Sequence, residues 1–426
     1  MQSAENIRED ISKGKYDEKL LDVYADNSVL DYQRYRYVSA IDKFEELFGA
    51  ANVEIYSAPG RSEVGGNHTD HQHGQVLAAS VNLDVIAIVE KTDNDIIKIY
   101  SDSYDIGEIN VNDTVKRTKE EGTSESLVRG VVQKLKDEGY LVGGFNAYMT
   151  SDVLVGAGLS SSAAFEVAVG TVLSGLYNDM KIDPIFIAQA SQYAENVYFG
   201  KPCGLMDQMA SSVGSLVNID FEDVEKPVVN KVDVDFDKFD HSLCIVDTKG
   251  SHANLTPEYA AIPPEMKAVA KYFGKEYLRE VNEKEFFANI ADVRKKAGDR
   301  AILRAIHFFG DHNRVTDEVN ALKNGDFELF KKLINESGNS SFKYLQNVYP
   351  ASDITNQAVS IGLAISETVL NGKGASRVHG GGFAGTIQAF VPNNLVKEYR
   401  EALDGVFGEG SCHVLKVRKY GGMRFC

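Results

Sequence analysis

Apolar residues recur along the chain in two kinds of spacing, one typical of helices and the other typical of strands. Spaced apolar residues among charged ones predict helices over residues 5–25, 31–49, 124–139, 184–199 and 394–405. Runs rich in β-branched residues predict strands over residues 53–59, 76–91, 96–101 and 143–153, the first of them ending at Pro59-Gly60. After residue 214, two or three strands precede a long, mainly helical stretch, 258–370. This order predicts an α+β protein of two lobes, which we assign to residues 1–220 and 221–426.

Composition and charge restrict the classes of partner. The chain has 426 residues, of which 45 are Lys or Arg and 62 are Asp or Glu, so its formal net charge is −17. An acidic surface repels nucleic acids and anionic membranes, and we expect neither as a partner. A small phosphorylated molecule is not excluded, because it needs only a local positive field.

The cysteines and the N-terminal residues indicate the compartment. The four cysteines are scattered and form no C-x-x-C pair, which disfavours a structural zinc site or a disulfide framework. The first twenty residues are polar and charged, without the apolar segment of a secretory signal, and no apolar run reaches the length of a membrane span. We expect a soluble, cytoplasmic protein. The sequence does not define the oligomeric state, for which a monomer is the expectation.

The segment GAGLSSSAA at residues 156–164 joins a glycine-rich turn to a long apolar helix. The first turn of a helix has unpaired N–H groups and a partial positive charge, which suit a phosphate group. A simple N-cap would need only one serine and no paired glycines. We therefore interpret the segment as a phosphate-binding loop, although it matches neither the Walker A motif nor the G-x-G-x-x-G fingerprint.

Two other glycine-containing segments are candidates for a binding site. HGGGFAG at 379–385 is compatible with a hairpin turn or with close approach of the backbone to a ligand. In KPCGLMDQ at 201–208, Asp207 follows a turn and stands where a helix could start. Its carboxylate is compatible with a helix-start residue or with a general base, and both remain open. Glu195, on the preceding predicted helix, is by default a solvated surface residue.

The segment GRSEVGGNHTDHQHG at 60–74 contains three of the nine histidines, His68, His71 and His73, with Asp70 among them. Imidazole and carboxylate groups suit zinc, and the run is loosely similar to the H-x-H-x-D-H motif of metallo-β-lactamase-type hydrolases. The order of residues differs from that motif, however, and the other six histidines show no comparable clustering. We therefore disfavour a zinc site.

Together, four segments resemble the motifs of the galactokinase family of GHMP kinases, in the order in which that family has them. PGRSEVGGNHTDHQHG resembles the signature G-R-x-N-x-I-G-E-H-T-D-Y-x-x-G, and GAGLSSSAA resembles the phosphate loop of GHMP kinases. GLMDQ at 204–208 resembles the family segment G-x-M-D-Q, and SRVHGGGFAG resembles the third, glycine-rich motif. The four segments extend from Pro59 to Gly385, so the resemblance covers most of the chain.

The resemblance implies a fold and a reaction. The implied two-lobed GHMP kinase fold has an N-terminal lobe related to ribosomal protein S5 domain 2 and a C-terminal α+β lobe, with the active site between them. The implied reaction moves the γ-phosphoryl group of MgATP to the anomeric hydroxyl of galactose and gives galactose 1-phosphate. ATP, Mg²⁺ and a sugar are therefore the expected small-molecule partners.

The resemblance also implies roles for individual residues. Asp207 corresponds to the proposed catalytic base, and Arg61 to the arginine that keeps it ionised and neutralises charge on the transferred phosphoryl group. The expected sugar contacts are Arg61, Asn67, His68, Asp70, Gly204, Asp207 and Tyr259. The expected triphosphate contacts are Gly156, Ala157, Gly158, Leu159, Ser160, Ser161 and Ser162. The expected Mg²⁺ contacts are Ser162 and Glu195.

The signature is altered where the family binds the sugar. The glutamate of G-E-H-T-D is Asn67 here, the asparagine of G-R-x-N is Glu63, and the usual isoleucine is Gly65. In the family that glutamate contacts a sugar hydroxyl, and an amide can do so with a different preference. The resemblance thus implies a sugar kinase with galactose expected first, and N-acetylgalactosamine, arabinose or another hexose as alternatives. A non-catalytic galactose sensor is less favoured, because the phosphate loop is complete.

Overall fold

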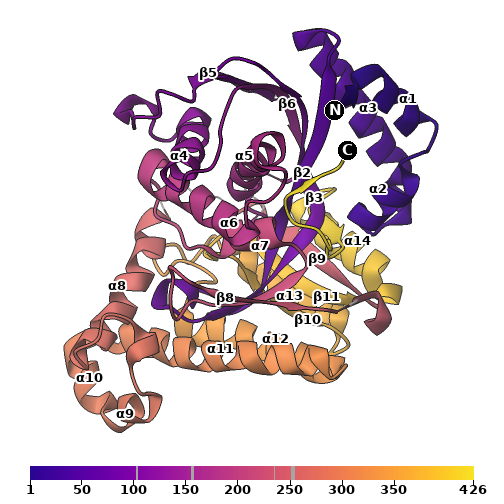
Figure 1. The fold of residues 1–426 in the computed structure, drawn as a ribbon. Coiled ribbons are helices and arrows are strands. Elements are labelled where there is room, and N and C mark those ends of the chain that lie inside the picture. The colour runs from indigo at the N-terminus through magenta and orange to yellow at the C-terminus, as the bar shows by residue number, and fades with distance from the viewer. Residues whose placement is uncertain (102–103, 155–157, 235, 251–254) are drawn as a thin grey trace.

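The computed structural model describes residues 1–101, 104–154, 158–234, 236–250 and 255–426. Figure 1 shows helices on both sides of a large twisted sheet, a smaller sheet below it, and a helical extension at the lower left. Within the described ranges, the helices are all too short or too polar to cross a membrane.

The larger sheet has nine strands among the described residues. Six of them follow the order β1-β2-β3-β6-β4-β5, while β13 pairs with β2, β7 with β3 and β8 with β7. The strands are β1 (Gln2–Ser3), β2 (Asn52–Gly65), β3 (Gln75–Lys91), β4 (Ile96–Ser101), β5 (Tyr104–Asn110), β6 (Phe145–Ser151), β7 (Leu216–Asp220), β8 (Val228–Val232) and β13 (Met423–Arg424). Neighbouring strands are antiparallel except β4 and β6.

Strand β2 is longer than the sequence pattern predicts. Its predicted end at Pro59-Gly60 is wrong, because β2 continues to Gly65, with register shifts against β3 between Pro59 and Arg61 and between Glu63 and Gly65. Such a bulge accommodates proline, which has no N–H for the ladder. Arg61 and Glu63 therefore lie on a strand rather than in a loop.

Helices from different parts of the chain cover the two faces of this sheet. Ile55 and Ile86 pack with the helices before β2, whereas Tyr56 and Ala87 pack with helices that follow β5. This alternation is the period of two of a strand with both faces buried. The helices on the first face are α1 (Ala4–Ser12), α2 (Asp17–Tyr24) and α3 (Leu30–Phe48), and those on the second face include α4 (Ser124–Asp137) and α5 (Ser161–Asn178).

The smaller sheet is antiparallel and has the order β10-β11-β9-β12. Its strands are β9 (His241–Asp247), β10 (Ala375–His379), β11 (Thr386–Pro392) and β12 (Cys412–Leu415). The remaining helices are α6 (Pro184–Tyr193), α7 (Met206–Val213), α8 (Thr256–Tyr272), α9 (Glu283–Ala288), α10 (Ile290–Ala297), α11 (Asp299–Lys323), α12 (Phe327–Ser340), α13 (Ala358–Leu370) and α14 (Val396–Phe407). α13 and α14 pack on this sheet, and α11 contacts both α8 and α12; α11 and α12 lie at the bottom of the molecule in Figure 1.

Candidate active site

A cavity of about 770 Å³ lies where the end of β2 meets the start of α7 and the glycine-rich segment after β10. Five of the predicted site residues line it: Arg61, His68, Asp70, Gly204 and Asp207. A separate cavity of about 520 Å³ lies between α12 and α13, and none of the described site residues lines that one. The fold thus brings together two sequence segments that are more than a hundred residues apart.

An ion pair joins β2 to α7 at the wall of this cavity. Arg61 Nε donates to Asp207 Oδ1 at 2.7 Å, and the two side chains are 7% and 33% exposed. Ser160 donates to the other carboxylate oxygen, and Arg61 also donates to the carbonyl oxygen of Gly158. Burial by itself would raise the pKa of Asp207, but Arg61 and Ser160 outweigh burial and hold that pKa below its ordinary value. Asp207 is therefore an ionised carboxylate beside the start of α5.

The predicted phosphate loop leads into the N-terminus of α5. Gly156 and Ala157 lie outside the described residues. Gly158 has φ +67°, and a Cβ there would come within 2.7 Å of the Thr386 hydroxyl oxygen. Ser160 is also in the left-handed region, with φ 55°, and its carbonyl begins the hydrogen bonding of α5. The close approach of the loop to the smaller sheet requires glycine at position 158.

Leu159 and the serines at the helix start complete the described part of the loop. Leu159 is fully buried, and its carbonyl oxygen accepts a hydrogen bond from the backbone N–H of Arg61 at 3.1 Å. Ser161 and Ser162 are the first two residues of α5, where backbone N–H groups have no partner within the helix. The helix therefore directs free donors and its positive end toward the region of Asp207.

Two buried glutamates lie close to this helix start. Glu195 is in the π-helical turn Ala194–Phe199, and its carboxylate accepts hydrogen bonds from Lys201 Nζ at 2.9 Å and Gln208 Nε2 at 2.8 Å. Gln208 also donates to Glu166 at 3.2 Å, so both carboxyl groups converge on one amide. Glu166 Oε1 is buried and lacks a hydrogen-bond partner among the described residues. Glu195 is thus a buried residue, and the default expectation of a solvated surface position is wrong.

The turn that follows β2 carries His68 and Asp70 into the cavity. His68 Nε2 contacts the carbonyl oxygen of Gly381 at 3.0 Å, and burial lowers the pKa of His68 to about 4, so the ring is neutral and donates. Burial raises the pKa of Asp70 to about 6. A Cβ at Gly204 would come within 1.9 Å of Asp70 Oδ2, so the close approach of the two segments depends on glycine.

Asn67 and Tyr259 are not among the described residues that line the cavity. Asn67 is fully buried, and its carbonyl oxygen contacts His307 Nε2 at 2.8 Å. The Tyr259 hydroxyl donates to the carbonyl oxygen of Gly382 at 2.7 Å, behind the glycine-rich segment. In this structure both predicted sugar contacts are therefore engaged by backbone carbonyls of the glycine-rich segment.

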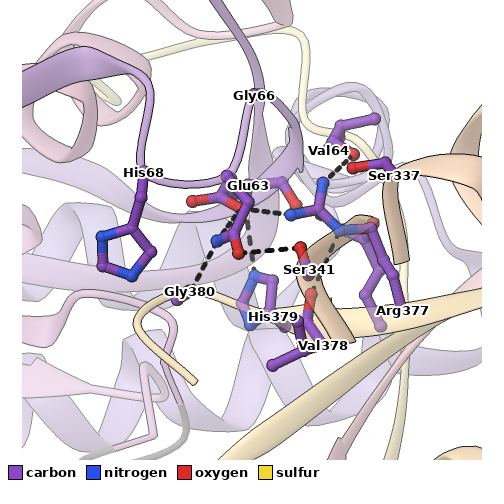
Figure 2. Close-up of polar contacts among 12 residues, drawn as sticks. Glu63, Val64, Gly66, His68, Ser337, Ser341, Arg377, Val378, His379 and Gly380 are labelled. Carbon is purple, nitrogen blue, oxygen red and sulfur yellow. Dashed lines mark hydrogen bonds and ion pairs between the residues drawn. The ribbon is translucent and has the colours of Figure 1, made fainter. Parts of the chain in front are cut away.

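The sequence analysis did not predict the partner of Glu63. Arg377 Nη2 lies 2.6 Å from Glu63 Oε1, and both residues are buried (Figure 2). Arg377 is part of the segment SRVHGGGFAG. Its position before the triple glycine was the sequence signal that could have pointed to this residue. The sequence analysis also did not predict a second group of residues at the cavity. His73 stacks on Tyr277 with 3.7 Å between the ring centres, and Lys267 lies over the Tyr277 ring at 4.2 Å.

Two of the three histidines of the segment 60–74 are engaged by other protein groups. Within the described ranges, no group of three or more His, Cys, Asp and Glu side chains could hold a metal ion. His68 is engaged with Gly381, and His73 is stacked on an aromatic ring.

Comparison with known proteins places this geometry in a family. Residues 126–215 match the family described as GHMP kinases N terminal domain, and residues 42–91 match the galactokinase galactose-binding signature. The galactokinase of Glaesserella parasuis serovar 5 (strain SH0165) is 30% identical over 363 residues, which cover 85% of this chain and 91% of that protein. The galactokinase of Haemophilus influenzae (strain ATCC 51907 / DSM 11121 / KW20 / Rd) is 32% identical over 358 residues, which cover 82% and 88% of the two chains.

Solved structures agree with the sequence comparisons. The crystal structure of Lactococcus lactis galactokinase complexed with galactose has a TM-score of 0.76 at 26% identity, covering 90% of this chain and 98% of that one. Methanococcus jannaschii mevalonate kinase has a TM-score of 0.60 at 16% identity, covering 86% and 98%, which shows the shared fold alone. The expected α+β GHMP kinase fold is therefore confirmed. This chain belongs to the galactokinase family of GHMP kinases, which are phosphotransferases that use ATP.

Proposed function

We propose that this protein transfers the γ-phosphoryl group of ATP to the anomeric hydroxyl of galactose and releases galactose 1-phosphate and ADP. One observation carries the proposal: the ionised Asp207, held by Arg61 and Ser160, stands at the boundary between the helix start and the cavity. A phosphate donor and a sugar acceptor would meet at this boundary. The similarity to galactokinases over most of the chain supports the choice of sugar.

The proposed chemistry requires little covalent participation by the protein. The hydroxyl oxygen of the sugar forms a bond to the γ-phosphorus while the bond to the β-phosphate oxygen breaks, and the hydroxyl proton passes to Asp207. Phosphoryl transfer of this kind depends mainly on positioning and on neutralising charge. The Arg61 guanidinium, 2.7 Å from Asp207, would favour the ionised base and would stabilise negative charge on the phosphoryl group.

The start of α5 is the proposed binding site for the triphosphate. In this assignment the residues Gly156 to Ser162 surround the phosphates, and backbone N–H groups with the serine hydroxyls act as donors. Ser162 and Glu195 are the proposed holders of Mg²⁺. The donor set suits this ion, because Mg²⁺ prefers carboxylate and hydroxyl oxygens, and the buried Glu166 Oε1 leaves one more oxygen unpaired nearby. When bound, Mg²⁺ would neutralise charge on the phosphates of ATP.

The sugar is proposed to occupy the cavity between segments 1–220 and 221–426. His68, Asp70 and Gly204 line this cavity, and Lys267 and Tyr277 contribute from the C-terminal segment. A sugar ring needs a set of fixed donors and acceptors within a confined space, and these groups are of that kind. Tyr259 would act through the glycine-rich segment that it supports. We propose a monomer in the cytoplasm; the four free cysteines fit the reducing conditions of that compartment.

The deciding experiment measures ADP release with MgATP and a panel of galactose, N-acetylgalactosamine, arabinose and glucose. We expect turnover with galactose, which Asp207→Asn reduces by about three orders of magnitude or more while ATP binding is retained. If another sugar supports turnover and galactose does not, that sugar replaces galactose as the proposed substrate. Binding of ATP and galactose without turnover of any sugar would refute the kinase proposal and indicate a sensor. Dependence on added Mg²⁺, with restoration after EDTA treatment, tests the proposed ion.

A further inference from the structure

Positions 63 and 67 carry exchanged side-chain types. The signature that this chain resembles has an amide at the first of these positions and a carboxylate at the second, whereas this chain has Glu63 and Asn67. The two side chains are in contact, with Asn67 Nδ2 donating to Glu63 Oε1 at 2.9 Å. The chain thus keeps one carboxyl and one amide at this point, in reversed order. Their surroundings determine which of them can meet a ligand.

The Asn67 side chain has no hydrogen-bonding capacity left for a ligand. Its Nδ2 donates to Glu63 and to the carbonyl oxygen of Gly380 at 2.8 Å. Its Oδ1 accepts from Ser341 Oγ at 3.1 Å and from Asn347 Nδ2 at 2.9 Å. An amide has two donor hydrogens and two acceptor lone pairs, and all four are used by the protein. Asn67 is therefore a structural residue that joins β2 to the helix end near Ser341.

Glu63, in contrast, is held by one oxygen only and lines the cavity. Arg377 and Asn67 both donate to Oε1, at 2.6 and 2.9 Å, and no described residue makes a hydrogen bond to Oε2. Arg377 is itself fixed by the carbonyl oxygen of Val64 at 2.7 Å. In the view of Figure 2, Glu63 stands between Arg377 and the cavity residue His68. The carboxyl group of Glu63 is thus held through Oε1, and Oε2 is free to accept a hydrogen bond.

A third altered position belongs to the same arrangement. A Cβ at Gly65, where the signature has isoleucine, would come within 1.8 Å of Glu318 Oε2. Glu318 is fully buried, and neither carboxyl oxygen has a hydrogen-bond partner among the described residues. Burial, and then the neighbouring Asp311, raise the pKa of Glu318 well above its ordinary value, so the group is neutral. Gly65 therefore makes room for a second buried carboxyl group behind β2, away from the cavity.

We propose that Glu63 is the residue that selects the sugar at this wall of the cavity, by accepting a hydrogen bond at Oε2 from a sugar hydroxyl other than the one that is phosphorylated. The inference rests on the proposed sugar-kinase function. Asp207 and Arg61 occupy the reacting end of the cavity, so the hydroxyl that meets Glu63 is a different one. Burial raises the pKa of Glu63 to about 7 although Arg377 and Arg61 oppose the rise, so a large fraction is ionised at neutral pH. A charged acceptor makes the stronger hydrogen bond.

Glu63→Gln isolates the free oxygen. Because both protein donors use Oε1, the amide oxygen of glutamine can take that position, and the amide NH₂ then replaces Oε2 with a donor. The variant is tested with galactose and with 2-, 3-, 4- and 6-deoxygalactose, or with the deoxy derivatives of whichever sugar the wild type uses best. The measured quantity is kcat/KM for each sugar at saturating ATP, together with the KM for ATP.

We expect the wild type to lose about 10- to 100-fold in kcat/KM with one deoxy derivative, the one that lacks the partner hydroxyl. In Glu63→Gln, kcat/KM for the parent sugar should fall to the value for that deoxy derivative, so the preference disappears. The KM for ATP should stay unchanged. Glu318→Gln is the matched control, since it changes a buried carboxyl of the same cluster that does not line the cavity. It should keep the wild-type preferences.

A structural role for Glu63 predicts a different pattern and would overturn the proposal. All sugars would then lose the same factor in Glu63→Gln, or none would lose anything. If Glu63→Gln does not fold, the double variant Glu63→Met/Arg377→Met removes both charges together, which avoids an unpaired buried charge, and it should show the same loss of preference. Absence of turnover with every sugar in the wild type would instead refute the proposed function itself.

Discussion

Replacing Arg61 with glutamine tests the electrostatic link on which the proposed phosphoryl transfer depends. Arg61 Nε lies 2.7 Å from Asp207 Oδ1, and this contact keeps the pKa of Asp207 below its ordinary value in spite of burial. Two unit charges about 4 Å apart interact by about 4 kcal/mol at an effective dielectric constant of about 20. One pKa unit corresponds to about 1.4 kcal/mol, so the upper limit of the effect is about 3 units.

Solvent reduces this limit. The Asp207 side chain is 33% exposed, so water screens the pair, and the Ser160 hydroxyl continues to donate to the carboxylate. We therefore expect Arg61→Gln to raise the pKa of Asp207 by about 1–2 units. Asp207 is then protonated over part of the acidic pH range in which the wild type still has it ionised.

The assay is kcat as a function of pH, measured with saturating sugar and ATP. Under these conditions the profile reports groups of the bound complex, and weaker sugar binding does not enter. The acidic limb of Arg61→Gln should lie about 1–2 pH units above that of the wild type, whatever the overall loss in kcat. Arg34→Gln, which breaks an ion pair with Asp17 far from the cavity, is the control. An unshifted limb in an active Arg61→Gln enzyme would refute the link.

Three further predictions follow from the cavity and the buried carboxyl groups. Since the pKa of Asp70 is about 6, the KM for the sugar should rise as the pH falls below about 6. Asp70→Asn should have a high KM for the sugar that no longer depends on pH. Gly204→Ala should raise the KM for the sugar at least about 10-fold while ATP binding is kept, because its Cβ would lie 1.9 Å from Asp70 Oδ2. Glu318→Gln should stabilise the protein in urea unfolding at pH 8 more than at pH 5.

The sign for Glu318 follows from its raised pKa. Folding favours the protonated form, so the contribution of Glu318 to stability is complete below the ordinary glutamate pKa and is lost as the pH rises toward the folded value. The loss is up to about 1.4 kcal/mol per pH unit, which glutamine does not suffer. Equal stabilisation at both pH values would contradict the prediction. A wild-type KM for the sugar that is constant between pH 5 and 8 would contradict the prediction for Asp70. Unchanged sugar kinetics in Gly204→Ala would contradict the prediction for Gly204.

Local patterns predicted much of the fold correctly. The strand from Gln75 to Lys91 and the helix from Leu30 to Phe48 lie within one residue or so of their predicted positions, because hydrophobic spacing reflects the face that each element buries. The predicted strand end at Pro59 failed for a tertiary reason. A bulge against β3 lets the strand continue past the proline, and local propensity contains no information about a partner strand.

The candidate site likewise combines features that the sequence predicted with features that depend on tertiary contacts. Short-range features marked Asp207 and the start of α5, since a turn before a helix and a glycine-rich helix start depend on neighbouring residues only. Arg61 was identified only through the resemblance to the family motif. The sequence could not show that Glu195 is buried, because burial depends on the contacts that Gln208 and Lys201 supply from another segment.

The sequence by itself determined the family and the unusual order of Glu63 and Asn67, and it supplied the residues that we propose to react. Only the tertiary structure decided which of these two side chains meets the cavity. Asn67 is the residue at which the motif comparison expected a sugar contact, but Ser341, Asn347 and Gly380 take up its amide. Arg377, 314 residues away from Glu63 along the chain, binds one oxygen of that carboxyl and leaves the other free. The direction of a buried polar side chain is set by the partners that satisfy it, and these come from distant parts of the chain.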